Sequence, residues 1–194
     1  MAFISKTMKS KPKILLIYAQ RMVRGRTFEM IENLGILTLA ARLNANGFEA
    51  KAYTGITTDA MKTIEKMKED LFAVCFYCDF DNQTAVSSMI DYLKKQSSFY
   101  IVLGGPQTLH MTEKDIETYK ADAILKGEGE EILLEWLNGK LQGREITVSG
   151  EIRAKEKTDY VYLNDLSKYE LPRNEDKLDY EERPLLSVIT ARGC

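Results

Sequence analysis

Two glycine-rich turns are the segments of this sequence best suited to hold a ligand. Each follows a short apolar run, so each leaves the end of an expected strand without bulky side chains. They comprise Gly104, Gly105 and Pro106 in the first turn and Gly127, Glu128 and Gly129 in the second. Glycine lets a large flat or extended ligand approach the backbone, and the carboxylates of Glu128, Glu130 and Glu131 suit a helix N-terminus. Together the turns predict a groove for a bulky cofactor.

The segment after the first apolar run offers a different contact. Residues 19–26 include Gln20 and three arginines, of which Arg21 is the first. Arginine can hold a phosphate or a carboxylate, although a solvated loop is an equally good interpretation. The segment has neither the G-x-G-x-x-G turn of a dinucleotide site nor the hydroxyl-rich phosphate loop of a flavodoxin.

Cys75 and Cys78 form a C-x-x-C pair, a spacing that can bind a metal or form a redox disulfide. Here Cys75 falls inside a strand-like run, and side chains three residues apart in a strand point to opposite faces. We therefore expect neither a shared metal nor a disulfide. With Cys194 the chain has three cysteines, which are too few for a disulfide framework and favour a reducing cytoplasm.

Other residues with chemical potential lie near the expected strand ends. Tyr77 is expected to face the predicted groove and to flank a ligand, and the loop after it is acidic from Asp79 onward. Asp79 does not predict a phosphorylation site, because a receiver domain needs an acidic pair at the end of its first strand. His110, the only histidine, is expected at the surface, and Trp136 in the core.

The elements that must position these residues alternate regularly. Short apolar runs alternate with amphipathic stretches, which is typical of βα units around a parallel sheet. The sequence predicts an α/β fold over residues 11–142, a Rossmann-like or flavodoxin-like doubly wound sheet of five βα units. Right-handed crossovers favour the strand order 2-1-3-4-5, with the switch point between the first and third strands. The expected strands are 13–18, 48–53, 72–77, 99–103 and 121–126, and the expected helices are 34–46, 58–69, 82–96, a short one from 112 and 132–141.

Composition places the chain among globular proteins. Its 194 residues are 44% hydrophobic and 29% charged, and 27 Lys and Arg against 29 Asp and Glu give a net charge of −2. This balance gives no electrostatic footprint for nucleic-acid binding. No run approaches the roughly 20 apolar residues of a membrane span. We therefore expect neither nucleic acid nor a membrane as a partner.

The chain changes character after residue 142. Residues 143–184 combine short strand-like runs at 145–155 and 160–163 with a polar stretch, and predict a connecting segment. A further strand-like run, 184–190, comes directly before Cys194. We therefore expect residues 185–194 to begin another domain, and the chain to be cut from a longer protein.

Taken in order, several segments resemble one family. The segments "ILLIY", "LGILTLAARLNANGFEAKAY", "IVLGGPQTL", "ADAILKGEGEEILLEWL" and "LLSVITARGC" are similar to the N-terminal cobalamin-binding domain of cobalamin-dependent radical SAM enzymes, followed by the first strand of the radical SAM barrel. The resemblance covers nearly the whole chain. It implies a part that binds cobalamin and works with its own radical SAM domain, usually in methyl transfer. The fragment alone is not expected to be catalytic.

The resemblance also implies site residues. The corrin would lie over the loops after the first, third and fourth strands, and the nucleotide tail would enter near Gly104 and Gly105. Cys194 would be the first of three C-x-x-x-C-x-x-C thiolates that hold a [4Fe–4S] cluster with one iron open to S-adenosylmethionine; the other two are absent. The implied cobalamin contacts are Gln20, Arg21, Tyr77, Cys78, Asp79, Gly104, Gly105, Pro106, Gly127, Glu128 and Gly129.

Two departures from the family leave other hypotheses open. The loop after the first strand has no D-x-H-x-x-G histidine, which implies base-off cobalamin without a histidine ligand. Tyr77 stands where the family usually has a serine. The alternative is a degenerate domain of the same fold that has lost cobalamin and serves protein interaction or small-molecule sensing. Flavin binding is a third hypothesis.

Overall fold

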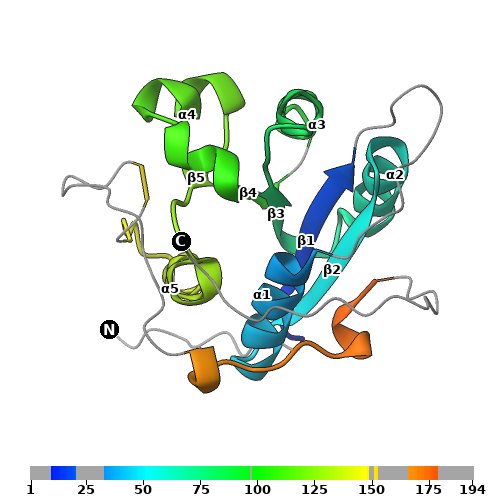
Figure 1. The fold of residues 1–194 in the computed structure, drawn as a ribbon, viewed down its shortest axis with the longest axis vertical. Coiled ribbons are helices and arrows are strands. Elements are labelled where there is room, and N and C mark those ends of the chain that lie inside the picture. Colours follow the sequence, from blue (N-terminus) through cyan, green and yellow to red (C-terminus); the bar gives the residue numbers. More distant parts are fainter. Residues whose placement is uncertain (1–9, 21–32, 97, 149–150, 153–165, 179–194) are drawn as a thin grey trace, which may run out of the picture.

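A five-stranded parallel sheet organises the protein (Figure 1). The computed structural model describes residues 10–20, 33–96, 98–148, 151–152 and 166–178. The strand order is β2-β1-β3-β4-β5 and all these pairings are parallel, as predicted. The strands are β1 (Lys13–Gln20), β2 (Glu49–Ile56), β3 (Leu71–Tyr77), β4 (Tyr100–Gly104) and β5 (Ala123–Ile124).

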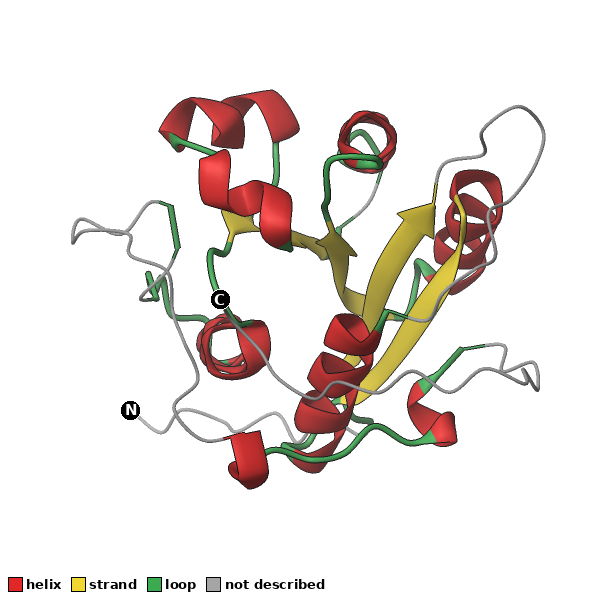
Figure 2. Ribbon diagram, viewed as in Figure 1, coloured by secondary structure: helices red, strands yellow, loops and turns green. Residues whose placement is uncertain are grey.

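Helices cover both faces of the sheet (Figure 2). Helices α1 and α5 pack on one face, and α2, α3 and α4 on the other. Among the described residues, none of the helices has the length and apolar character that crossing a bilayer requires. The α-helices are α1 (Leu34–Ala45), α2 (Thr57–Met67), α3 (Gln83–Leu93), α4 (Glu113–Tyr119) and α5 (Gly129–Leu141), and the 3₁₀ helix η1 (Pro106–His110) follows β4.

Each face of the sheet has its own apolar cluster because alternate strand residues point to opposite sides. In β3, Val74 and Phe76 join the cluster under α2, α3 and α4, whereas Ala73 and Cys75 join the one under α1 and α5. Trp136 of α5 is 1% exposed in the second cluster, which confirms its expected place in the core. This division decides which strand residues a site on either face can use.

Local signals set several helix ends as predicted. Helix α1 is capped by Asn33, whose Oδ1 accepts a hydrogen bond from the Ile36 N–H at 3.1 Å, and it ends before Gly47, which has a φ of +91°. Helix α4, whose start the sequence predicts at 112, begins with a capping box. The Asp115 carboxylate accepts hydrogen bonds from the Thr112 N–H at 2.6 Å and the Thr112 hydroxyl at 3.0 Å.

The segment after α5 differs from its prediction. Residues 144–148 form no strand, and among the other described residues of the expected strand 145–155, Glu151 forms only an isolated bridge to Leu125. The Ile152 N–H also donates to the Ile124 carbonyl at 3.1 Å. Strand β5 is correspondingly shorter than the predicted 121–126. The expected strands 160–163 and 184–190 lie outside the described residues.

Both edges of the sheet receive a short piece of this segment. Beside β5 it is Glu151, as above, and beside β2 it is Lys177, which bridges to Ala52 in parallel. The Leu178 N–H donates to the Ala52 carbonyl at 2.9 Å, and Asn44 Nδ2 of α1 donates to the buried Asp176 carboxylate at 2.6 Å. Pairing of this kind satisfies backbone groups that an open edge would leave exposed.

Candidate cofactor-binding site

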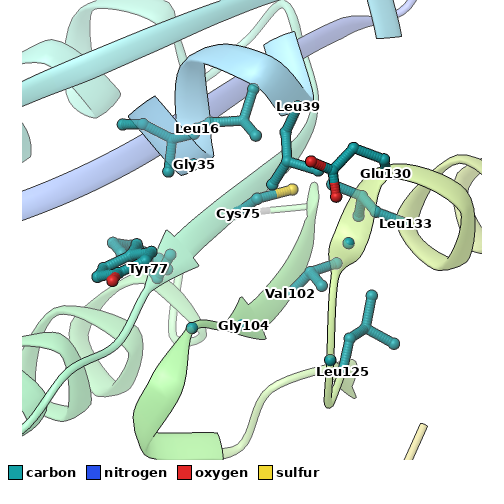
Figure 3. A pocket seen from close by; sticks show the side chains of 15 residues that line it. Leu16, Gly35, Leu39, Cys75, Tyr77, Val102, Gly104, Leu125, Glu130 and Leu133 are labelled. Carbon is teal, nitrogen blue, oxygen red and sulfur yellow. The ribbon is translucent and has the colours of Figure 1, made fainter. Parts of the chain in front are cut away.

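An apolar cavity lies at the carboxyl ends of β3 and β4, between the N-terminal halves of α1 and α5 (Figure 3). Its volume is about 140 Å³. A dry cavity of about 150 Å³ accommodates a benzene-sized ring, so this one has room for one aromatic ring. It is lined by Leu16, Cys75, Phe76, Tyr77, Val102, Gly104, Gly105, Leu125 and Gly127 from the strands and loops, and by Gly35, Ile36, Leu39, Gly129, Glu130 and Leu133 from the helices.

The strand order explains why the cavity lies here. The chain leaves β1 toward β2 on one side and continues from β3 toward β4 on the other, so the switch point falls between β1 and β3. Ligand crevices in doubly wound sheets form outside the carboxyl ends of the strands at this point. On this face two helices, α1 and α5, cover the sheet, and the ends of β3 and β4 remain open between them.

Gly104 and Gly105 have different roles. A Cβ at Gly104 would meet no heavy atom within 4 Å, whereas Gly105 has a φ of +100° and a Cβ there would lie 2.6 Å from the Cys78 carbonyl oxygen. The Cys78 N–H donates to the Gly104 carbonyl at 2.8 Å, and the Gln107 N–H donates to the Cys78 carbonyl at 3.1 Å. Gly105 therefore allows the loops after β3 and β4 to pack closely, and Gly104 keeps space open at the cavity.

Tyr77 lines the cavity, in agreement with its predicted orientation. Its ring packs edge-on against Tyr18 at the end of β1, with 5.1 Å between centroids and 77° between ring planes. Burial, followed by a hydrogen bond with Asp79, raises the pKa of Tyr18 to about 12, so this phenol is neutral at physiological pH. Tyr77 therefore gives the cavity one aromatic wall that a flat ligand can contact, and Tyr18, which does not line the cavity, supports this ring from behind.

Asp79 holds its own loop in place. Its Oδ1 accepts hydrogen bonds from the N–H groups of Asp81 at 3.0 Å and Asn82 at 2.9 Å. Asn82 Nδ2 donates to the Tyr77 carbonyl at 2.8 Å, so this side chain turns back toward β3 and makes no cap hydrogen bond to α3. Asp79 does not line the cavity, and its contribution is to fix the position of Tyr77.

The two cysteines of the C-x-x-C pair lie on opposite faces of the sheet, as predicted. Cys75 belongs to the cluster under α1 and α5 and lines the cavity, whereas Cys78 belongs to the cluster under the other helices. Burial raises the pKa of each thiol to about 12. Because Cys78 packs on the face opposite the cavity, its side chain points away from the cavity, and its backbone hydrogen bonds position the loop after β4.

The other predicted contacts divide into three groups. Gly127 and Gly129 line the cavity. Residues outside the lining are Gln20 at the end of β1, the exposed Pro106 at the start of η1, and Glu128 directly before α5. Arg21 and Cys194 are not among the described residues. His110 is exposed at the end of η1, as predicted.

Sequence reasoning missed the helical walls of the cavity. Leu39, Leu133 and Glu130, of which Glu130 is only 3% exposed, line the cavity but are not among the expected cofactor contacts. A Cβ at Gly129 would lie 3.1 Å from Leu39 Cδ2, so α5 approaches α1 closely here. A glycine in the first turn of each helix, Gly35 and Gly129, is the signal that could have identified these walls.

Known proteins provide a fold comparison. No known protein family matches the sequence, and no curated protein matches it. Two similar solved structures are of the radical S-adenosylmethionine methyltransferase TsrM from Kitasatospora setae. The one with tryptophan substrate and the SAM analog aza-SAM is 18% identical with a TM-score of 0.59, and the match covers 73% of this chain and 28% of that one. The one with cobalamin and a [4Fe–4S] cluster is 18% identical with a TM-score of 0.58, covering 86% and 32%.

The likeness shows a shared fold. This chain spans less than a third of the TsrM chain. The five-stranded parallel sheet with helices on both faces confirms the predicted Rossmann-like class.

Proposed function

We propose that this chain is the cobalamin-binding part of a cobalamin-dependent radical SAM enzyme, with methyl transfer as the reaction of the complete protein. The observation that carries the proposal is the apolar cavity at the switch point, whose volume of about 140 Å³ admits one ring of the fused aromatic base of a nucleotide tail. The similarity in fold to a protein solved with cobalamin bound supports it.

In this proposal residues 11–142 bind and orient the cofactor. Gly104 leaves the backbone accessible, and the Tyr77 ring, packed edge-on against Tyr18, forms the aromatic wall. The loop after β1 contains no histidine, so we expect base-off cobalamin without a histidine ligand. Bound cobalamin would carry the methyl group.

The cluster and S-adenosylmethionine would belong to the radical SAM domain, which residues 185–194 would begin after the connecting segment 143–184. Cys75 and Cys78 are buried on opposite faces of the sheet. They cannot join Cys194 in a three-thiolate set without unfolding the core. We therefore expect this chain alone to bind cobalamin without catalysing methyl transfer.

Hydroxocobalamin binding tests the proposal. The purified chain is mixed with hydroxocobalamin, and visible absorbance is followed through gel filtration; co-elution is expected. Gly104→Leu fills the cavity from a position with free space for a Cβ and should weaken binding at least about tenfold. Thr84→Leu adds a similar side chain at an exposed site on α3, across the sheet, and should bind normally.

The outcomes separate the parts of the proposal. Absence of co-elution with the wild-type chain would refute cobalamin binding. Equal binding by the Gly104→Leu variant, with its fold verified by urea unfolding, would show that cobalamin uses another surface.

The degenerate domain remains the second candidate, favoured by Tyr77 in place of the usual serine. A domain that has lost its ligand is expected to fill its crevice with its own side chains, and the open volume between α1 and α5 favours the first candidate. A chain that binds neither hydroxocobalamin nor riboflavin would support the second.

A further inference from the structure

We propose that the Glu130 carboxylate sets the specificity of the cavity by accepting a hydrogen bond from an N–H or O–H group on the ring-bearing part of the ligand. The inference rests on the proposed function, under which that part is the nucleotide tail of cobalamin. The ribose of this tail provides the hydroxyl group.

Glu130 lines the cavity, where it can accept a hydrogen bond from such a donor. Glu130 is 3% exposed, and a glutamate buried so fully needs hydrogen-bond donors around its carboxylate. Among the described residues that line the cavity, Glu130 alone has a carboxyl group. Figure 3 shows this carboxyl beside Leu39, on the wall where α5 approaches α1.

The fold compensates for burying this polar group and leaves it capacity to bind. Glu130 lies in the first turn of the 13-residue helix α5, where the helix dipole favours a negative charge. The Thr38 hydroxyl of α1 lies 3.2 Å from Glu130 Oε1 and 2.9 Å from the Gly35 carbonyl oxygen, and its single hydrogen can be donated to either. A carboxylate has about four acceptor sites on its two oxygens, so a ligand donor can bind it beside its protein partners.

An acceptor in an otherwise apolar cavity selects by chemistry. A ligand ring with an adjacent N–H or O–H gains a charge-assisted hydrogen bond, whereas a phosphate or carboxylate at the same place would be repelled. The ring and its neighbouring hydroxyl should therefore enter the cavity, while any phosphate of the ligand stays outside it.

The test compares two corrinoids and two matched variants. Hydroxocobalamin has the nucleotide tail, and dicyanocobinamide lacks it. Glu130→Gln should weaken hydroxocobalamin binding about tenfold or more and change dicyanocobinamide binding less than about twofold. Glu131→Gln removes a carboxylate from the same helix turn, but this side chain is 50% exposed and pairs with Arg42 at 2.9 Å. It should leave both affinities unchanged.

Each result decides the inference. Unchanged hydroxocobalamin binding by Glu130→Gln, or an equal loss of dicyanocobinamide binding, overturns it while the proposed function stands. If the wild-type chain binds no hydroxocobalamin, the proposed function fails. Riboflavin, whose fused rings have an N–H donor and whose side chain has hydroxyl donors, then becomes the probe. A tenfold loss of riboflavin binding in Glu130→Gln then supports the inference, and no binding or no loss overturns it. Should Glu130→Gln not fold, Glu130→Asp withdraws the acceptor from the cavity and carries the same expectation.

Discussion

Replacing Gly105 by alanine should destabilise the fold, whereas the same change at Gly104 should not. Gly105 has a φ of +100° and a ψ of 174°, a region that is almost confined to glycine and costs other residues about 1–3 kcal/mol. An added Cβ would also lie 2.6 Å from the Cys78 carbonyl oxygen and 2.8 Å from the Cys78 nitrogen. Both are backbone atoms held by hydrogen bonds between the two loops, so they cannot move aside independently.

The expected loss for Gly105→Ala is therefore about 3 kcal/mol, the upper part of the backbone term with the close contact included. This is a large share of the roughly 5–15 kcal/mol by which a domain is stable. Gly104→Ala meets nothing within 4 Å, and replacing a strand glycine by alanine should stabilise by about 0.5 kcal/mol.

Urea unfolding followed by tryptophan fluorescence measures both changes. Trp136 is the only tryptophan and is 1% exposed in the core, so its emission reports global unfolding. With a slope of about 2 kcal/mol per molar urea, Gly105→Ala should lower the midpoint by about 1.5 M. A midpoint for Gly105→Ala within about 0.3 M of that of Gly104→Ala would refute the argued packing of the two loops.

Three further predictions concern the core, a tyrosine and the connecting segment. Leu137→Ala removes a side chain that is 0% exposed and should cost about 2–5 kcal/mol of unfolding free energy in urea titration; less than 1 kcal/mol would contradict its place in the core. Folding raises the pKa of Tyr18 from 10.0 to about 12, so its stabilising contribution is complete below pH 10 and is lost as the pH rises toward 12. Ultraviolet titration should show one phenol that ionises at higher pH than the others, and Asp79→Asn should lower the pKa of Tyr18. An unchanged Tyr18 titration in the Asp79→Asn variant would contradict the contribution of Asp79. Asp176→Ala deletes a buried acceptor of two hydrogen bonds and should lower the free energy of unfolding by about 1–3 kcal/mol. Glu175 is 70% exposed in its side chain, so Glu175→Ala should lower it by less than about 0.5 kcal/mol. Equal effects of the two variants would show that the connecting segment does not dock through Asp176.

Local patterns were enough to predict most of the elements. Alternating apolar and amphipathic stretches predicted the strand order, and the spacing of Cys75 and Cys78 predicted opposite faces, because these features depend on backbone periodicity alone. The capping box between Thr112 and Asp115 was predictable for the same reason, since donor and acceptor are three residues apart.

Features that depend on distant partners were missed. Of the expected strand 145–155, the described residues 145–148 form no strand, and Glu151 forms only an isolated bridge to Leu125 beside β5. An alternating pattern contains no information about which distant strand the segment will meet or how long that strand is.

The candidate site shows the same division. From the sequence alone came the α/β class, the carboxyl edge as the place for a ligand, and the glycine turns and Tyr77 as candidates, because the switch point follows from strand order. Only the tertiary structure distinguished Gly104, which keeps space open, from Gly105, which is required by the Cys78 backbone. It also brought Glu130 of α5 beside Thr38 of α1. Those two residues are far apart in the chain, and their meeting depends on how two helices pack across one sheet, which no local pattern records.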